Sequence, residues 1–232
     1  MRMRNFLTAQ SLSIVAVTAM ATLFTPHLFG ANLVVNGDFE SDTVSFSVWP
    51  GYTGNGNPDD LSGWTGEGGR GVNPITNDAE ARDLAPFRDN GDNETFVAFL
   101  QGNSSIQQDV TGLHVGTDYV LSLDFNSRNC CGDAPVAEIL LNDIVVGSSA
   151  GLFPDPGAIP PVGGTEAWYH ADIDFTAPET SLTLKISSGP SAGGDATLIV
   201  DNISIEAIPE PSATALLLCG LIGALAIRRR RR

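Results

Sequence analysis

Several aromatic and polar side chains of the chain suit ligand recognition. Six residues carry this potential: Trp49, Tyr52, Trp64, Trp168, His170 and Arg128. Aromatic faces can stack on the apolar faces of sugars, and planar polar groups then fix orientation through hydrogen bonds. Trp168 and His170 are the more suggestive pair, because both fall on the outward phase of one predicted strand. Packing in the core or in a loop is the alternative role for each aromatic residue, above all for Trp49 and Trp64.

Motifs of catalysis are scarce in this sequence. Beyond the N-terminal segment the chain has two histidines, His114 and His170, and it contains no HExxH, GxSxG, P-loop or GxGxxG motif. Glycoside hydrolysis requires two carboxylates that flank one bond. With 27 acidic residues in the chain, nothing selects such a pair. We therefore expect that the protein is not an enzyme.

A carboxylate interrupts the apolar face of the last predicted strand, 196–206. Ile199, Asp201, Ile203 and Ile205 share one phase of its period-two pattern. An unpaired buried carboxylate is costly, and the surrounding sequence offers few basic partners. A hard cation with oxygen ligands would resolve the conflict. A β-bulge that turns Asp201 to solvent, or a hydrogen bond to a nearby amide, would resolve it as well.

Charge is distributed unevenly along the chain. Its 232 residues carry 12 Lys and Arg against 27 Asp and Glu, a formal net charge of −15. Seven of the basic residues lie at the two ends, as Arg2, Arg4 and Arg228–Arg232, and every acidic residue lies between those ends. A body this acidic repels nucleic acid and anionic membrane surfaces. We therefore expect no nucleic-acid partner.

Alternation of apolar and polar residues dominates the body of the chain, residues 32–207. The clearest strands are 118–126, 168–175 and 181–187. Further candidate strands are 32–40, 44–49, 94–100, 104–110, 136–147 and 196–206. Gly-, Asn-, Asp- or Pro-rich stretches predict loops at 50–60, 66–93 and 148–166. About nine short strands with long connections favour an all-β fold, a two-sheet antiparallel sandwich of the jelly-roll type.

Three stretches of the body resemble the galactose-binding-like jelly rolls of carbohydrate-binding modules. They are NLVVNGDFE at 32–40, SIQQDVTGLHVGTDYVLSLDF at 105–125 and IVDNISIE at 199–206. The resemblance implies that the first stretch opens the sandwich and the third closes it. It also implies a structural calcium between these strands, with Asp38 and Glu40 joining Asp201 as ligands.

Both ends of the chain have the features of targeting segments. Residues 1–31 combine Arg2 and Arg4 with a mostly apolar stretch, which is typical of a secretory signal peptide. An uncleaved N-terminal anchor is the alternative. Near the other end, 213–227 is an uncharged run before five arginines. As a helix it would span roughly 22 Å of a hydrocarbon core about 30 Å thick, and snorkelling arginines would hold its cytoplasmic end.

The C-terminal region 208–232 resembles the PEP-CTERM sorting signal of Gram-negative bacteria. Its parts, in order, are the motif Pro209, Glu210 and Pro211, the transmembrane helix 213–227 and the arginine cluster 228–232. The resemblance implies that an exosortase-type membrane protease removes the tail. The protein then passes from the inner membrane to the cell surface or extracellular matrix. A permanent single-pass anchor is the alternative.

These patterns together predict an exported, non-catalytic protein of the cell surface or matrix, whose jelly roll binds carbohydrate such as exopolysaccharide. A structural matrix protein that acts by self-association or by calcium bridging is the alternative. Cysteine usage adds little, since only Cys130, Cys131 and Cys219 are present. A vicinal Cys130–Cys131 disulfide would be strained and would stiffen its loop. Intermolecular pairing and free thiols are equally compatible with the sequence.

Overall fold

A computed structural model describes residues 30–74, 96–128, 135–151, 168–188 and 196–209 of the chain. Strands account for most of these residues. Their bounds are β1 (Thr65–Pro74), β2 (Phe96–Thr111), β3 (Asp118–Ser127), β4 (Ala137–Leu141), β5 (Ile144–Ser148), β6 (Tyr169–Thr176), β7 (Ser181–Ser188) and β8 (Thr197–Ala207). One short 3-10 helix, η1 (Glu40–Asp42), precedes β1. All pairings between strands are antiparallel, in the order β5-β4-β7-β2-β8-β3-β6, with β1 on β2.

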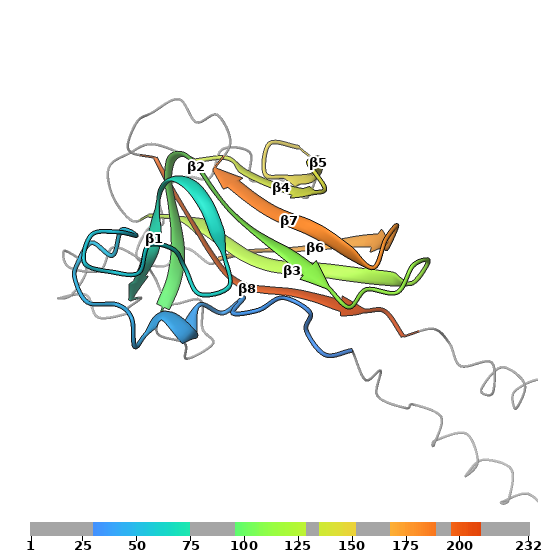
Figure 1. Cartoon of the computed structure of the whole chain (residues 1–232). Coiled ribbons are helices and arrows are strands. Elements are labelled where there is room, and N and C mark those ends of the chain that lie inside the picture. Colours follow the sequence, from blue (N-terminus) through green and yellow to red (C-terminus); the bar gives the residue numbers. More distant parts are fainter. Residues whose placement is uncertain (1–29, 75–95, 129–134, 152–167, 189–195, 210–232) are drawn as a thin grey trace, which may run out of the picture. The chain divides into compact units, whose positions relative to one another are not determined.

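The long strand β2 belongs to both layers of a sandwich (Figure 1). Its first part, Ala98–Gln101, pairs with β8, whereas its second part, Ser105–Thr111, pairs with β7. One layer therefore continues through β8, β3 and β6, and the other through β7, β4 and β5. The prediction of an all-β, jelly-roll-type antiparallel sandwich is confirmed.

The main hydrophobic core lies between the two layers. Strand β3 shows the reason, because its alternation buries Tyr119, Leu121, Leu123 and Phe125. The same cluster takes in even-numbered residues of β2 and β7 and both aromatic stacks between β3 and β6, such as Tyr119 on Phe175. Burial of apolar surface on this scale is the main force that holds the layers together.

The opening stretch corrects two strand predictions. Residues 32–40 form turns leading into η1, and 44–49 form further turns. Asn32 prevents a regular strand, since its side-chain Oδ1 accepts hydrogen bonds from the backbone N–H groups of Val34 and Ile205, at 2.9 and 3.0 Å. The stretch still runs beside β8, where Leu33 N–H donates to the Ile205 carbonyl.

The predicted loop 66–93 is wrong over its first residues, which form β1. The many glycines of β1 conceal its strand character because they remove the apolar alternation. Glycine is required at two positions, since a Cβ on Gly66 would lie 2.1 Å from the Ser105 carbonyl oxygen and one on Gly71 would lie 2.0 Å from that of Gly51. Small residues let neighbouring backbones approach closely.

Two other strand predictions have different boundaries in the structure. The separate strands expected at 94–100 and 104–110 are the single strand β2. The strand expected at 136–147 is the hairpin of β4 and β5, with Asn142 and Asp143 both at positive φ, 48° and 61°. Asn and Asp tolerate that conformation better than most residues, and two such residues in a row suit a tight hairpin turn.

A buried carboxylate organises the segment before β1. Asp42 is only 1% exposed, and it accepts three hydrogen bonds: from Asn36 Nδ2 at 2.9 Å, from Ser62 N at 3.0 Å and from Ser62 Oγ at 2.7 Å. Burying a charge is tolerated only when hydrogen bonds compensate it. Asp42 thereby ties the turns after residue 36 to the segment that leads into β1.

Asp42→Ala should lower the free energy of unfolding by about 1–3 kcal/mol, because it leaves the Asn36 amide and the Ser62 N–H without their acceptor. Chemical denaturation of the body domain measures this difference. The exposed Asp59→Asn change serves as the control, with an expected effect within about 0.5 kcal/mol. Equal stability of the Asp42→Ala variant and the wild type would contradict the role assigned to this carboxylate.

Candidate ligand-binding face

The outer surface of the layer β6-β3-β8-β2 carries a row of neighbouring side chains that do not face the main core. Asn126 on β3 is paired with Ile199 on β8, and Ile199 with Phe99 on β2. Beyond Phe99, Tyr52 forms a bridge to Gly71 of β1. Trp168 directly precedes β6 at the other end of this row. The row thus places an aromatic residue near each end.

The middle of this row is a second, smaller hydrophobic cluster. Val97, Phe99 and Ile199 are buried there, and the partly buried Tyr52 and Trp168 pack against them. The rings of Tyr52 and Phe99 meet edge to face, with centroids 5.1 Å apart. The Tyr52 hydroxyl also donates a hydrogen bond to Gln101 Oε1. Tyr52 and Trp168 are therefore held in place by packing while part of each remains exposed.

A β-bulge in β8 determines what else faces outward. Ser204 pairs with Ser122, but Asp201 pairs with Asp124, so β8 has one more residue than β3 between these pairs. The extra residue is Asn202, whose φ of 51° is left-handed. The prediction that Asp201 shares a face with Ile203 is therefore wrong. Asp201 lies on the outer face with Ile199, is fully buried there, and accepts a hydrogen bond from Asn202 N at 2.9 Å.

His170 on β6 lies between two carboxylates of the same outer face. Its Nδ1 is 2.7 Å from Asp124 Oδ1, and its Nε2 is 3.2 Å from Asp172 Oδ1. The other oxygen of Asp124 accepts a hydrogen bond from Asn202 Nδ2 at 3.0 Å. Asp172 also accepts a hydrogen bond from Ser122 Oγ at 2.5 Å. A polar network therefore crosses β6, β3 and β8 beside the aromatic row.

The charge of His170 depends on these carboxylates. The hydrogen bond to Asp124 raises the pKa of His170 above its ordinary value of 6.5, and the negative charges of Asp124 and Asp172 raise it further, against a lowering by partial burial. More than half of the side chain, 57%, is exposed to solvent. The imidazolium form thus extends to higher pH than in a free histidine.

A polar pocket of about 380 Å³ lies where the opening stretch runs beside β8. Its polar lining consists of Asn32, Asn36, Asp38, Asn202 and Ser204. Asn202 also belongs to the network of His170, so the pocket and the network share a residue. The alternation of β8 after the bulge places Ser204 on the outer side, since Ile203 and Ile205 face the core.

The predicted aromatic residues lie in different environments. Trp168 and Tyr52 lie on the outer face, and His170 with them. Trp64 is 2% exposed in the main core, where its ring is 5.9 Å from that of Phe39 and its Nε1 donates to the Asn36 carbonyl at 3.1 Å. Trp64 therefore has the alternative role given above, packing in the core, where a ligand cannot reach it.

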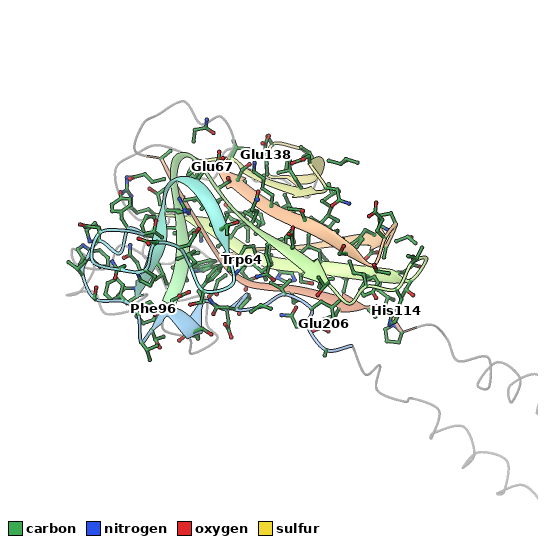
Figure 2. The ribbon with its side chains drawn as sticks, in the orientation of Figure 1. Trp64, Glu67, Phe96, His114, Glu138 and Glu206 are labelled. Atoms are coloured by element: carbon green, nitrogen blue, oxygen red, sulfur yellow. The ribbon has the colours of Figure 1, made fainter. Side chains whose placement is uncertain are left out.

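Trp49 and Arg128 complete the predicted set. Trp49 is 38% exposed in the loop before Tyr52. Arg128 directly follows β3, and its backbone N–H donates to the Thr197 carbonyl at 3.2 Å, next to the outer row. The other histidine named from the sequence, His114, lies in the turn between β2 and β3 (Figure 2).

The predicted calcium ligands do not form a cluster. Glu40 Oε1 accepts a hydrogen bond from Phe96 N at 2.8 Å, and Asp38 Oδ1 accepts one from Glu40 N at 3.3 Å. Asp201 Oδ1 accepts a hydrogen bond from the backbone N–H of Asn202, the bulge residue of β8. Within the described ranges, no group of three or more His, Cys, Asp or Glu side chains is arranged to hold a metal ion. The described structure therefore does not group Asp38, Glu40 and Asp201, and calcium binding stays a prediction.

Several predictions lie outside the described residues. They concern residues 1–29 of the predicted signal peptide at 1–31, the pair Cys130 and Cys131, and the C-terminal features. These last are Glu210 and Pro211, the helix 213–227 and the arginine cluster 228–232. Pro209 is described, two residues after the end of β8. In the part of the chain that is described, no helix is long and apolar enough to span a membrane.

Sequence reasoning missed Asp124, Asp172 and Asn202 as partners of His170. Asp172 shares the outward phase of His170, two residues further along the strand, so the pattern did contain that signal. Asp124 could be found only with the register of β3 against β6, which pairs it with His170. Asn202 reaches the network because of the bulge, which the alternation of β8 does not reveal.

No protein-family model matches the chain, and no curated protein matches it. Among solved structures, TmCBM61 in complex with β-1,4-galactotriose is similar at 15% identity over 75% of this chain and 97% of that chain, with a TM-score of 0.43. The CBM22-1–GH10 modules of Clostridium thermocellum xylanase 10B with xylohexaose match at 15% identity over 65% and 27% of the two chains, with a TM-score of 0.39. The CBM22-1 xylan-binding domain of Paenibacillus barcinonensis Xyn10C matches at 14% identity over 64% and 87%, with a TM-score of 0.37. These likenesses concern the fold alone.

Titration of the His170 imidazole by NMR should show a pKa above 6.5, and Asp124→Asn should lower that pKa more than Asp172→Asn does. Because the folded-state pKa is raised, the stabilising contribution of the imidazolium is complete below pH 6.5 and is lost as the pH rises through the raised pKa. Asp174→Asn, on the same strand without a contact to His170, is the matched control. A wild-type pKa at or below 6.5 would refute the bridging arrangement.

Proposed function

We propose that this chain is a non-catalytic carbohydrate-binding protein of the cell surface or extracellular matrix. The observation that supports it is the outer face of β6-β3-β8-β2, where the partly exposed Trp168 and Tyr52 lie beside a network of carboxylate, imidazole and amide groups. Trp168 supplies a face for stacking on a sugar ring. His170 and its partners supply hydrogen-bonding groups that are already oriented by one another.

The physical demands of sugar binding fit this arrangement. A sugar ring has an apolar face that stacks on an aromatic side chain and a rim of hydroxyls that need both donors and acceptors. Asp124 and Asp172 accept hydrogen bonds, and the imidazole of His170 connects them. Packing of Trp168 on the second hydrophobic cluster fixes its orientation before a ligand arrives. Binding then costs less conformational entropy.

The same geometry supports a binding role over hydrolysis. A glycosidase keeps its two carboxylates on opposite sides of the scissile bond, with room for the substrate between them. Asp124 and Asp172 instead contact the two nitrogens of one imidazole ring, at 2.7 and 3.2 Å. The space between these carboxylates is thus filled by the side chain of His170.

Export and sorting are part of the proposal and depend on the sequence features at the two ends. An N-terminal signal peptide would deliver the acidic body across the membrane. An exosortase-type protease would then act at the motif of Pro209, Glu210 and Pro211 and release the body to the surface or matrix. The motif begins two residues after the end of β8. The residue between them, Ile208, is fixed to β3 because its backbone N–H donates a hydrogen bond to the Asp118 carbonyl at 2.9 Å. The folded domain would therefore remain intact after cleavage.

Trp168→Ala should weaken retention of the purified body domain on polysaccharide affinity gels by about tenfold in dissociation constant, because the loss of a stacking contact costs about 1 kcal/mol or somewhat more. Trp64→Phe is the matched control. It should lower stability while leaving retention of the folded protein unchanged. Equal retention of the Trp168→Ala variant and the wild type would count against the proposed face. No retention on any polysaccharide would count against the function. Calcium-dependent light scattering that is reversed by chelator would favour the structural alternative.

Replacement of Pro209, Glu210 and Pro211 by alanines should block removal of the tail in the native host. Intact-mass analysis of the recovered protein tests this directly. The variant is expected to keep its five terminal arginines and to fractionate with the membrane, whereas the wild type is expected to lose them. A wild-type protein recovered with Arg228–Arg232 still attached would contradict the sorting proposal.

A further inference from the structure

The polar pocket beside β8 has hydrogen-bonding capacity that the fold does not use. Ser204 makes no hydrogen bond with its hydroxyl within the described residues, and Asp38 uses only Oδ1, for Glu40 N. Asn32 donates one N–H of its amide to the Ile203 carbonyl at 3.2 Å. Its second amide N–H has no acceptor among the described residues. The pocket therefore offers a carboxylate oxygen, a hydroxyl and an amide N–H toward its open space of about 380 Å³.

This set of groups points to a polyhydroxylated ligand. A sugar hydroxyl can donate to Asp38 and accept from Asn32 or Ser204, so all three groups find partners at once. The polar lining contains no basic side chain, which leaves an anionic group such as a uronate without compensation. Asp38 would repel that anion.

The pocket is continuous with the proposed binding face. Asn202 lines the pocket and also donates to Asp124, which in turn contacts His170. From β6 to the opening stretch beside β8, a ligand would cross three strand spacings, or about 14 Å in total. That distance exceeds a single sugar ring and suits a chain of several sugar residues.

We propose that the pocket is a second sugar subsite, which binds hydroxyls of an uncharged polysaccharide chain that also stacks on Trp168. This inference rests on the proposed function and narrows its ligand to an uncharged chain of several sugar residues. The stacking platform and the pocket hold different residues of the same chain. Affinity therefore grows with the length of the ligand until both are occupied.

Calorimetric titration of the body domain with neutral oligosaccharides of one to six residues tests the inference. Xylo-, cello- and β-1,4-galacto-oligosaccharides serve as probes, with an oligouronate as the charged comparison. We expect affinity to rise with length and the oligouronate to bind at least tenfold more weakly than a neutral probe of equal length. Ser204→Ala and Asp38→Asn should each weaken the longest bound probe by about two- to tenfold, and the shortest bound probe much less.

Matched controls lie elsewhere on the domain. Ser187→Ala on β7 and Asp143→Asn in the β4–β5 turn repeat the two chemical changes away from the pocket, and both should bind like the wild type. Melting temperatures of all four variants verify that each is folded. Pocket variants that bind long probes as well as the wild type would overturn the second subsite while leaving the proposed function intact. A domain that binds no probe of any length would overturn both.

Discussion

The β-bulge at Asn202 is the constraint on which the outer face depends. Before the bulge, Leu198 and Val200 face the core; after it, Ile203 and Ile205 do. A regular strand would have to bury Asp201 among these isoleucines or expose two of them. The extra residue at left-handed φ allows β8 to fill the core along its whole length and still send Asp201 and Ile199 outward. Bulges commonly redirect side chains in this way next to functional sites.

The consequence is a layer with hydrophobic packing on both sides. Most of its outer surface is polar, but Val97, Phe99 and Ile199 are buried there as a cluster of their own. An apolar patch on the outer side of a sandwich must be shielded from solvent, and Tyr52 and Trp168 shield part of this one. The packing that stabilises this cluster also holds both aromatic residues in position. Their exposed portions can then contact a ligand without further ordering. Structure and proposed function thus rely on the same contacts.

The sequence predicted the strands with strong alternation and the general fold. β3, β6 and β7 were predictable because apolar and polar residues alternate over most of each strand, and Trp168 and His170 were assigned correctly to the outer phase. β1 was not predictable, because its glycines serve close backbone approach and leave no apolar pattern. The sequence grouped Trp64 with Trp49 as the aromatics most suited to packing, but it could not show that Trp64 is buried and Trp49 partly exposed, since the burial of Trp64 depends on Phe39 and the turns held by Asp42. The partners of His170 required the register between strands, which is set by the fold as a whole.

Mapping of a neutral oligosaccharide onto the body domain by NMR tests the central claim most directly. The indole N–H signals of Trp168 and Trp64 report on the outer face and the core in one spectrum. Binding at the proposed face predicts a shift of the Trp168 and His170 signals with saturation at a common affinity, while the Trp64 signal stays in place. Shifts confined to residues of β4, β5 and β7, on the other layer, would contradict the account.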